Sequence, residues 1–422
     1  MKKSSNLTIL QKFFLTFSFF KQNDLYTYSL SCAFGFLYSL LPILLMITIV
    51  LIRFLHGSPE LVYQVISIFT EYIDTSSIST ITDRLLEVGK IGVFEIVIGL
   101  SIFWLARRFF FTVLQGVQRI FHSHSERRPF VANVIVILSE VVLVIGASII
   151  FFIGSTLKPI INSDFLLSIF PFLKHTAVLQ STRLFSALFI MSFVAIAYRL
   201  GSGTKPSWKL CFFSAFLVMI LFSGLQIGFD LFLNINKYNL IYGVLGKLII
   251  MLLELSFFFS FFLFFAQYVY VNQFFDILLL GEIYLLPDRN DTDFFEGLRR
   301  IMFIRPDVFL KSNNTGSEII NFSKGQLIFS QGDTETNIFY ISKGSVELTR
   351  KNNVSYKERG CFFGEISFIL NEPQNASASA LTDVQLIKID KTLFSQLLEK
   401  NPEVAQKMMT QISTHFSQFY TK

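Results

Sequence analysis

Six long apolar stretches constrain the fold of this chain more than any other feature. They lie near residues 28–52, 88–113, 131–157, 182–200, 209–233 and 241–272. A helix needs about 20 predominantly apolar residues to cross roughly 30 Å of hydrocarbon. Within lipid, a helix satisfies its backbone hydrogen bonds internally, which an irregular segment cannot do. The stretches therefore predict a polytopic α-helical membrane bundle of about six spans.

The composition favours a membrane protein over a soluble one. Of 422 residues, 52% are hydrophobic, 16% are charged and 52 are Phe, whereas about 25% of the residues of a soluble domain are charged. The net charge of +6 belongs to the first 285 residues, which hold 20 Lys and Arg against 14 Asp and Glu. Basic residues beside apolar stretches meet anionic lipid. We predict the lipid bilayer as a partner, and nothing in this pattern favours nucleic-acid binding.

Two basic connections orient the predicted spans. One covers residues 107–128 and the other covers residues 199–209. The positive-inside rule places both connections in the cytoplasm. Because the number of predicted spans is even, both termini are then cytoplasmic too. We predict a multi-pass protein with both termini on the cytoplasmic side.

The first 30 residues differ from the spans that follow. Short apolar runs alternate there with Lys2, Lys3, Lys12 and Lys21, and no small-residue cleavage site precedes the first span. A signal peptide has one central apolar region followed by such a site. A helix that lies on a membrane surface combines apolar and basic residues instead. We therefore predict an interfacial helix that stays attached.

Ionisable side chains inside the predicted spans mark a candidate membrane path. They are Glu95 and Arg108 in the second span, Glu140 in the third and Glu254 in the sixth. An ionisable group near the bilayer centre costs about 2.5–3.5 kcal/mol, so it usually faces a partner or a water-filled path. Two interpretations stay open: these side chains line a path for a solute or ion, or a neighbouring helix or the interface satisfies them.

The residue pattern gives little support to enzyme chemistry. A metal-dependent nuclease groups His, Asp and Glu ligands around its cations. This chain has five His, and its one HxH pair, His122 and His124, has Glu126 as the single nearby acid. Its three Cys lie in separate segments and form neither a CxxC pair nor a disulfide framework. We predict no enzyme activity, no catalytic residue and no metal site.

The sequence changes character after residue 285. Residues 286–293 are polar, and residues 294–304 have helical spacing. Short strands are predicted at residues 326–330, 338–342, 345–350 and 384–389, and closing helices at 393–398 and 404–419. Many short strands with turns between them are typical of a β-roll or jelly roll. We therefore predict a membrane domain at 1–285, a linker at 286–293 and an α+β domain at 294–422.

Four segments of the membrane domain form a pattern by their order and spacing. The segments are Tyr28–Pro42, Glu126–Phe130, Tyr198–Leu200 and Tyr238–Gly246. Together they resemble the YihY/BrkB family of bacterial inner-membrane proteins. The resemblance implies a six-span bundle in the inner membrane with a role in transport or envelope integrity. One departure is visible, because Phe265-Ala266-Gln267 stands where we align Gly-Ala-Glu in the family.

A framework of glycines and aromatic residues runs through the soluble domain. It consists of Phe322, Gly325, Ile328, Phe329, Gly332-Asp333, Tyr340-Ile341, Gly344, Val346, Gly360 and Phe363-Gly364-Glu365. This framework resembles the cyclic nucleotide-binding domain family. The resemblance implies that backbone N–H groups after Glu365 hold the cyclic phosphate of cAMP or cGMP and that Glu365 accepts a hydrogen bond from the ribose 2′-hydroxyl. The predicted ligand cassette is Phe363, Gly364, Glu365, Ile366, Ser367, Gln374, Asn375 and Ser377.

The arginine that pairs with the phosphate in that family is replaced by Gln374. A charge-assisted bond contributes about 1.5–3 kcal/mol, so its loss weakens binding by about one to two decades. Gln374, Asn375 and Ser377 can still donate neutral hydrogen bonds. Three interpretations stay open: the domain binds a cyclic nucleotide, it binds another small ligand, or it is a degenerate module for assembly or docking.

Two classes of function follow from these features. In the first, the chain is a transporter or envelope-integrity factor that its cytoplasmic domain regulates through a ligand. In the second, it is a membrane scaffold without transport activity, whose C-terminal domain serves dimerisation or partner docking. The carboxylates inside the predicted spans favour the first class. The missing arginine and Gln267 favour the second. A homo-oligomer is compatible with both.

Overall fold

The computed structural model describes residues 6–53, 93–121, 129–161, 176–232, 235–285, 294–303, 317–335, 337–350, 353–389 and 391–420. The chain divides into two compact units. Phe14–Gln273 form the first, which we call the bundle unit. Met1–Phe13 and Phe274–Lys422 form the second, which we call the β-roll unit. The predicted linker at 286–293 lies outside the described residues, and the predicted domain boundary there stays a prediction.

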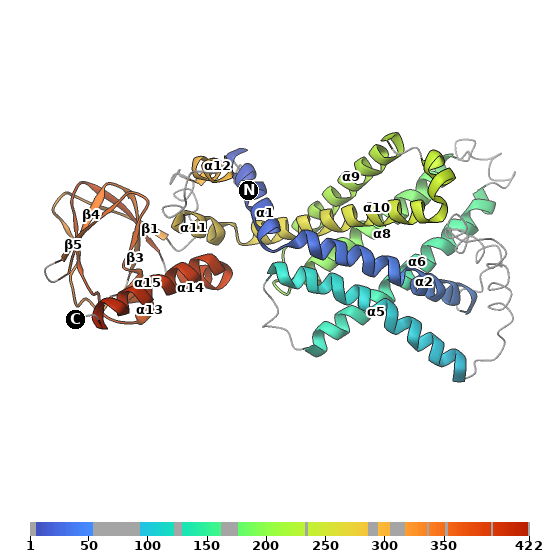
Figure 1. Cartoon of the computed structure of the whole chain (residues 1–422), viewed down its shortest axis with the longest axis horizontal. Helices are drawn as coiled ribbons and strands as arrows, with labels where there is room; N and C mark the ends of the chain where they lie inside the picture. The colour runs from blue at the N-terminus through green and yellow to red at the C-terminus, as the bar shows by residue number, and fades with distance from the viewer. Residues whose placement is uncertain are drawn as a thin grey trace. The chain divides into compact units, whose positions relative to one another are not determined.

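Long helices make up the bundle unit (Figure 1). Helix α1 (Asn6–Gln22) enters it, and six helices follow among the described residues: α2 (Leu25–Arg53), α5 (Val93–Phe121), α6 (Pro129–Ile161), α8 (Thr176–Gly201), α9 (Trp208–Phe232) and α10 (Ile235–Gln273). The described part of each predicted apolar stretch lies on one of these six. Helix α2 packs chiefly on α5 and α10, and α9 packs on α8 and α10. The predicted helical region is confirmed.

Three of the described helices contain a segment long and apolar enough to cross a membrane. The segments are Asn133–Ile150 in α6, Trp208–Phe229 in α9 and Leu248–Gln273 in α10. A shorter apolar segment, Phe185–Gly201, lies in α8. The structure therefore supports a helical region with three candidate spans, and the count of six stays a prediction.

Aromatic rings fill the centre of the bundle unit where three helices meet. Phe36 of α2 lies 5.2 Å from Phe109 of α5 between ring centroids, and Phe109 lies 5.8 Å from Phe259 of α10. Both pairs meet edge to face, the arrangement that the charge distribution of the rings favours. The buried Tyr198 of α8 stacks on Phe262 and donates a hydrogen bond of 2.8 Å to the Phe262 carbonyl. These contacts hold α2, α5, α8 and α10 in one core.

A tight corner joins α1 to α2. Asp24 has φ 52°, a left-handed conformation that ends α1 before Leu25 starts α2. Asn23 fixes this corner, because its carbonyl accepts from Arg119 Nε at 3.1 Å and its Nδ2 donates to Gln267 Oε1 at 3.2 Å. The two helices are therefore separate elements, and the end of α1 is tied to α5 and α10.

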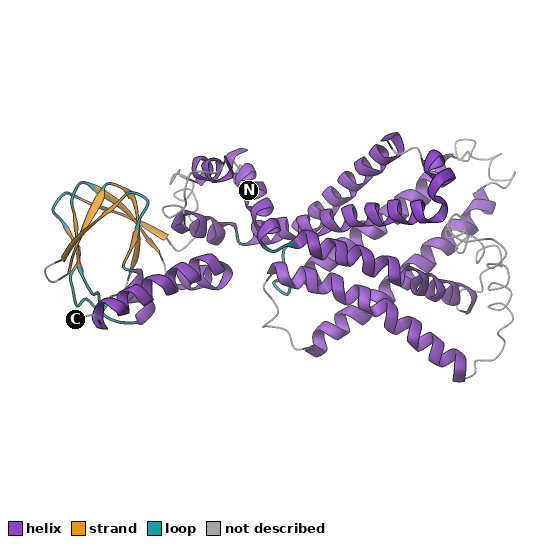
Figure 2. Cartoon of the chain, viewed as in Figure 1, coloured by secondary structure: helices purple, strands orange, loops and turns teal. Residues whose placement is uncertain are grey.

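The β-roll unit contains two four-stranded antiparallel sheets (Figure 2). Its strands are β1 (Ser317–Phe322), β2 (Leu327–Phe329), β3 (Ile338–Lys343), β4 (Ser345–Arg350), β5 (Asn353–Glu358), β6 (Phe362–Phe363), β7 (Ser377–Ala380) and β8 (Val384–Ile389). The sheet orders are β1-β8-β3-β6 and β2-β7-β4-β5. The four predicted strands correspond to β2, β3, β4 and β8. The predicted α+β fold is confirmed for this part of the chain.

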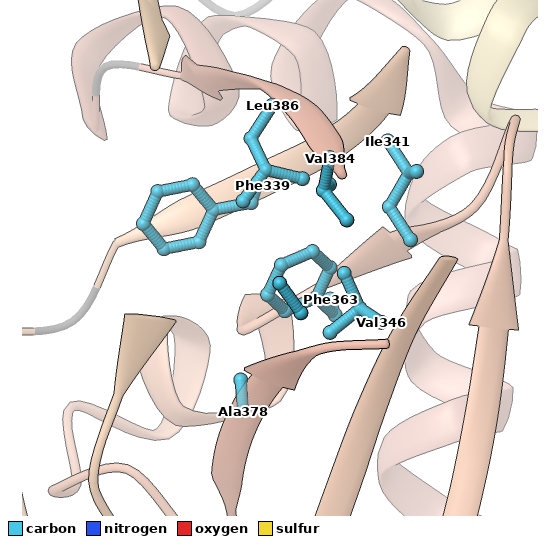
Figure 3. Close-up of a cluster of buried hydrophobic side chains, with 8 residues drawn as sticks. Phe339, Ile341, Val346, Phe363, Ala378, Val384 and Leu386 are labelled. Carbon is cyan, nitrogen blue, oxygen red and sulfur yellow. The ribbon is translucent and has the colours of Figure 1, made fainter. Parts of the chain in front are cut away.

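The core of the β-roll unit lies among side chains from both sheets (Figure 3). Phe339 and Phe363 pair across β3 and β6 in the same sheet, with their ring centroids 5.3 Å apart. Phe329, from the other sheet, stacks on both at 6.1 and 5.9 Å. Around these rings lie Ile341, Val346, Ala378, Ala380, Val384 and Leu386. The aromatic stack therefore joins the two sheets.

Five described helices complete the β-roll unit. They are α11 (Phe275–Leu285), α12 (Phe294–Phe303), α13 (Glu365–Leu370), α14 (Lys391–Lys400) and α15 (Pro402–Tyr420). Helix α11 packs on α14 and α15, and all of its residues except Asp276 are buried. Its Glu282 forms an ion pair of 2.7 Å with Arg299 of α12. A helix that looks by composition like membrane sequence is thus a core element of the β-roll unit.

Candidate ligand cassette and membrane path

The cassette begins where β6 turns into α13. Phe363 ends the strand, Gly364 has φ 86°, and Glu365 is the first residue of the helix. A side chain at Gly364 would collide with the carbonyl oxygen of Asn337, and the left-handed φ is unfavourable for other residues. The glycine is therefore required by the backbone. The turn brings the N–H groups of α13 to one end of the core.

Glu365 is the buried carboxylate of the cassette. It is 7% exposed, and burial raises its pKa above the ordinary value of 4.5. A bond to a backbone N–H and the cations Lys357 and Lys407 act in the opposite direction but do not cancel the effect of burial. The predicted role of Glu365, accepting a bond from a ribose hydroxyl, needs an acceptor oxygen, which either protonation state retains.

Gln374 lies beside the cassette turn. Its side chain is 3% exposed, its Nε2 is 3.5 Å from the Glu335 carbonyl oxygen, and a Cβ built on Gly364 would lie 3.8 Å from that Nε2. Its backbone is held by Asp333 and Gly332, through N–H···O bonds of 2.9 and 2.8 Å. The fold thus brings Gln374 to Gly364, as expected for a residue that shares a ligand with this turn.

The remaining cassette residues hold their loops in place. Ser367 is buried, and its hydroxyl accepts a bond from the Asn375 backbone N–H at 3.3 Å. The Ser377 hydroxyl accepts from the Gln331 backbone N–H at 2.9 Å. Ile366 is half-buried. Both hydroxyls keep their own hydrogen to donate elsewhere, and a ligand role for these residues stays a prediction.

Two residues at the cassette were not foreseen from the sequence. Lys407 of α15 donates to the Tyr284 carbonyl of α11 at 2.7 Å, and its Nζ lies 4.4 Å from the centre of the Tyr284 ring. The Tyr284 ring in turn lies 4.9 Å from the ring of Phe362, which directly precedes the cassette. Lys407 also acts electrostatically on Glu365. Helix α11 therefore contacts the strand that leads into the cassette, and α15 acts electrostatically on Glu365, which no local pattern in the sequence signals.

Glu140 of α6 stands out in the bundle unit. It is 1% exposed, and neither carboxylate oxygen has a hydrogen-bond partner among the described residues. Val136, Val144 and Ser148 are buried on the same face of the helix. Arg107 of α5 acts on Glu140 electrostatically and donates to Asn133 Oδ1 at 2.8 Å. The pair of oxygens is thus inside protein and near a cation without being bonded to it.

The other predicted path residues with described side chains, Arg108 and Glu254, are not buried. Arg108 is exposed, so the neighbouring Arg107 is the arginine near the carboxylate. Glu254 lies on α10 and is half-buried. Glu95 lies on α5, where only the backbone is described. The four predicted residues lie on three helices, and Glu140 alone is buried among those with described side chains. Their shared path stays a prediction.

Gln267, at the position of the expected family carboxylate, is fully buried in the bundle unit. Its Oε1 accepts from Asn23, and its Nε2 has no hydrogen-bond partner in the described part of the chain. His122 and His124 lie outside the described residues. Among the residues that the structure describes, no group of three or more His, Cys, Asp and Glu side chains could hold a metal ion.

Several known proteins are similar to part of this chain. A cyclic nucleotide-gated potassium channel of Mesorhizobium japonicum is 34% identical over 82 residues, which is 19% of this chain and 23% of the channel. One of Rhizobium etli is 28% identical over 129 residues, 27% of this chain and 36% of the channel. The chain thus spans about a quarter to a third of these relatives. The catabolite activator protein of Thermus thermophilus matches with 22% identity and a TM-score of 0.24, over 28% of this chain and 56% of that one.

Two family models account for most of the sequence. Residues 319–401 match the model of the cyclic nucleotide-binding domain, which covers both sheets and the cassette. Residues 16–273 match the model described as virulence factor BrkB, which covers more than half of the chain and nearly the whole bundle unit. The chain therefore belongs to the BrkB family, with a cyclic nucleotide-binding domain following its helical region.

Proposed function

We propose that this protein is a transporter or envelope-integrity factor of the bacterial inner membrane, regulated by its C-terminal domain on the cytoplasmic side. The observation that carries the proposal is Glu140, a buried carboxylate whose oxygens are not hydrogen-bonded to any described residue. Such a group in a helical membrane protein is expensive and is retained where a solute or ion passes. Arg107, close by, would favour an anionic partner or the charged form of the carboxylate.

The regulatory part of the proposal rests on the cassette. Gly364, Glu365 and Gln374 meet at one turn, and two similar channels are named as gated by cyclic nucleotides. The ligand would be cAMP or cGMP, bound weakly because Gln374 stands at the arginine position. In the chain, α10 ends at Gln273 and α11 begins at Phe275. A ligand that changes the packing of α11 would therefore act on a helix that directly follows the bundle.

The transport proposal is tested by replacing Glu140 with Gln in the chromosomal copy. The change removes the charge and preserves the shape of the side chain. We expect survival under detergent stress to fall about tenfold or more, because the group is used and not merely tolerated. Glu318→Gln, the same change at an exposed position of β1, serves as the matched control. Wild-type survival of the Glu140→Gln strain, at wild-type protein levels in the membrane, would contradict the proposal.

The ligand proposal is tested by calorimetry on the full chain in nanodiscs, with cAMP and with cGMP. We expect weak binding by the wild type and binding about 10–100-fold tighter by Gln374→Arg, because the arginine adds a charge-assisted bond to phosphate. Gln396→Arg adds the same charge at an exposed position of α14, outside the cassette, and should change little. Tight binding by the wild type, or no gain from Gln374→Arg, would refute the weakened-site proposal.

A second candidate function is a membrane scaffold without transport activity. Gln374 and Gln267 favour it, since each replaces a charged residue expected at its position by a neutral one that is buried. In this case the C-terminal domain would dimerise or dock a partner. Light scattering of the full chain in detergent, together with the calorimetry, separates the two. A stable dimer that binds no nucleotide even with Gln374→Arg would favour the scaffold.

A further inference from the structure

We infer that the connection between α8 and α9 binds the phosphate of an anionic phospholipid, whose acyl chains lie along α9. The connection covers residues 202–207, and the contacts are made by Lys205, Trp208 and Lys209. All of these residues belong to the bundle unit. The inference goes beyond general contact with a bilayer, because it assigns one class of headgroup to one set of side chains. It needs only a bundle unit that lies in a membrane, and it does not depend on the proposed path or cassette.

The connection lies between two apolar segments. Phe185–Gly201 ends directly before it, and the candidate span Trp208–Phe229 begins directly after it. The second segment has 22 residues, a helix of about 33 Å, which matches the hydrocarbon thickness of about 30 Å. Lipid tails cannot satisfy the polar groups of an irregular backbone. The connection is therefore at the level of the headgroups, where tryptophan is enriched in membrane proteins.

Hydrogen bonds to both neighbouring helices and to α10 fix the conformation of the connection. The Thr204 hydroxyl donates to Gln273 Oε1 of α10 at 3.0 Å, and Gln273 Nε2 donates to the Thr204 carbonyl at 3.1 Å. Arg199 of α8 donates to the Pro206 carbonyl, and its guanidinium lies 4.6 Å from the centre of the Trp208 ring. A ligand that binds here does not have to order the backbone, which lowers the cost of binding.

Two lysines at the connection are available to an anion. Lys205 and Lys209 are exposed, and neither has a hydrogen-bond or ion-pair partner among the described residues. No Asp or Glu occurs in residues 176–229, so no acid close in sequence neutralises them. Lys205 also has φ 50°, a left-handed conformation that is uncommon for residues other than glycine. A phosphate would accept charge-assisted hydrogen bonds from both ammonium groups.

A line of exposed aromatic side chains runs from the lysines along α9. Trp208 is 45% exposed, Phe212 37% and Phe216 51%, and residues four apart lie on one face of a helix. The rings of Trp208 and Phe212 are 5.9 Å apart between centroids. A free phosphate would use the lysines alone, whereas a phospholipid would use the lysines for its headgroup and the aromatic line for its acyl chains. The shared chemistry is a phosphate, and the aromatic line favours lipid as its source.

The charge of the connection selects among phospholipids. Arg199, Lys205 and Lys209 give it three positive charges. A zwitterionic lipid carries an ammonium of its own, which these cations would repel, whereas an anionic lipid brings net negative charge. The geometry therefore favours a lipid such as phosphatidylglycerol over phosphatidylcholine.

Quenching of Trp208 fluorescence by brominated lipid tests the inference. The chain has two Trp, so Trp104→Phe leaves Trp208 as the single reporter. The full chain with this change is placed in bilayers of equal parts phosphatidylglycerol and phosphatidylcholine, with bromine on the acyl chains of one lipid at a time. We expect brominated phosphatidylglycerol to quench Trp208 more strongly, with a preference of about tenfold over phosphatidylcholine, because the lysines hold the anionic headgroup beside the indole.

Three further variants of this reporter protein test the role of the lysines. Lys205→Gln with Lys209→Gln should reduce the preference to about one. Lys205→Arg with Lys209→Arg keeps both charges and should keep the preference. Lys324→Gln with Lys343→Gln removes the same charge at exposed positions of the β-roll unit and should also keep it. A preference that survives the first pair of changes, or that the arginine pair abolishes, would overturn the assignment to these lysines.

The remaining outcomes concern the ligand itself. Equal quenching by the two lipids would overturn the selection of an anionic headgroup. Absence of quenching by either lipid would show that Trp208 does not contact the bilayer, which refutes the lipid site without bearing on the cassette. If millimolar inorganic phosphate, at constant ionic strength, abolished the preference, the site would belong to free phosphate and the lipid assignment would be wrong.

Discussion

Buried carboxylates have different surroundings in the two units of this protein. In the β-roll unit, Glu282 is 2% exposed and forms an ion pair of 2.7 Å with Arg299. In the bundle unit, Glu140 is equally buried, yet neither of its oxygens is bonded to a described residue. A buried charge needs compensation. Where the protein itself supplies the compensation the residue has a structural role, and where it does not, a functional role is the better explanation.

The largest effect in this comparison is expected from breaking the buried pair. Arg299→Met leaves Glu282 buried without its cation and should lower the free energy of unfolding of the β-roll unit by about 3–5 kcal/mol. Urea unfolding, followed by hydrogen exchange of α14 and α15 peptides, measures the loss. The double variant Arg299→Met with Glu282→Leu removes both charges and should recover most of it. A loss below about 1 kcal/mol in the single variant would mean that the pair is not a structural element.

Glu365 offers an intermediate case, because burial raises its pKa despite two nearby lysines. A carboxyl whose pKa is higher in the folded state favours folding when it is protonated, and this contribution is lost as the pH rises from 4.5 through the folded-state pKa. Glu365→Gln should therefore stabilise the β-roll unit by about 1 kcal/mol at pH 7 and have no such advantage below pH 4.5. Unfolding of both proteins across this pH range gives the difference, and a gain independent of pH would contradict the titration of Glu365.

Each unit contains a buried tyrosine with a hydrogen-bonded hydroxyl, so the strength of such a bond can be compared between the two units. The Tyr198 hydroxyl of the bundle donates to the Phe262 carbonyl at 2.8 Å, and that of Tyr284 in the β-roll unit lies 2.8 Å from Gln411 Oε1. Tyr→Phe should cost about 1 kcal/mol at Tyr284 and about 0.6 kcal/mol at Tyr198, because side-chain bonds within membranes average less. Urea unfolding measures the first and detergent-induced unfolding the second. A larger loss at Tyr198 would reverse the comparison.

The smallest effect on stability is expected at Glu140. Glu140→Gln removes the desolvation of a carboxylate that has no hydrogen-bond partner among the described residues, so the bundle should be unchanged or more stable, within about 0.5 kcal/mol. Detergent-induced unfolding followed by the fluorescence of Trp104 and Trp208 provides the measurement. If the variant instead lost several kcal/mol, Glu140 would be compensated by the protein in the same way as Glu282. The distinction between the two units would then fail.

The pattern of apolar residues and glycines in the sequence predicted most of the long helices and four of the strands. The described part of each apolar stretch is helical, and the glycine-bounded runs form β2, β3, β4 and β8. The strand β7 was missed because Ser377–Ala380 contains only Ser and Ala, which have little preference for strands. Pairing with β2 and β4 on its two sides determines its conformation. Helix α11 falls inside the predicted membrane domain, because eleven mostly apolar residues look alike in lipid and in a protein core.

The residues of the two candidate sites also fall into two groups: those that the local sequence could predict, and those that only tertiary packing brings to the site. The spacing of the cassette placed Gly364 and Gln374 at one turn, since both lie on a short local segment. Lys407 could not be predicted, because β7, β8 and α14 separate it in sequence from the cassette and tertiary packing alone brings it there. Likewise Arg107 and Arg108 are equivalent in the sequence, and only the orientation of α5 directs the first toward α6.

The buried packing of α11 determines where the chain can be divided. A protease that cuts at residues 286–293 would separate α11 from α14 and α15 and uncover the apolar surface beneath Tyr284. The released C-terminal fragment would be prone to aggregation. A fragment that starts at Phe274 keeps α11 and the Glu282–Arg299 pair together. A C-terminal fragment that preserves this packing therefore begins directly after the last residue of α10.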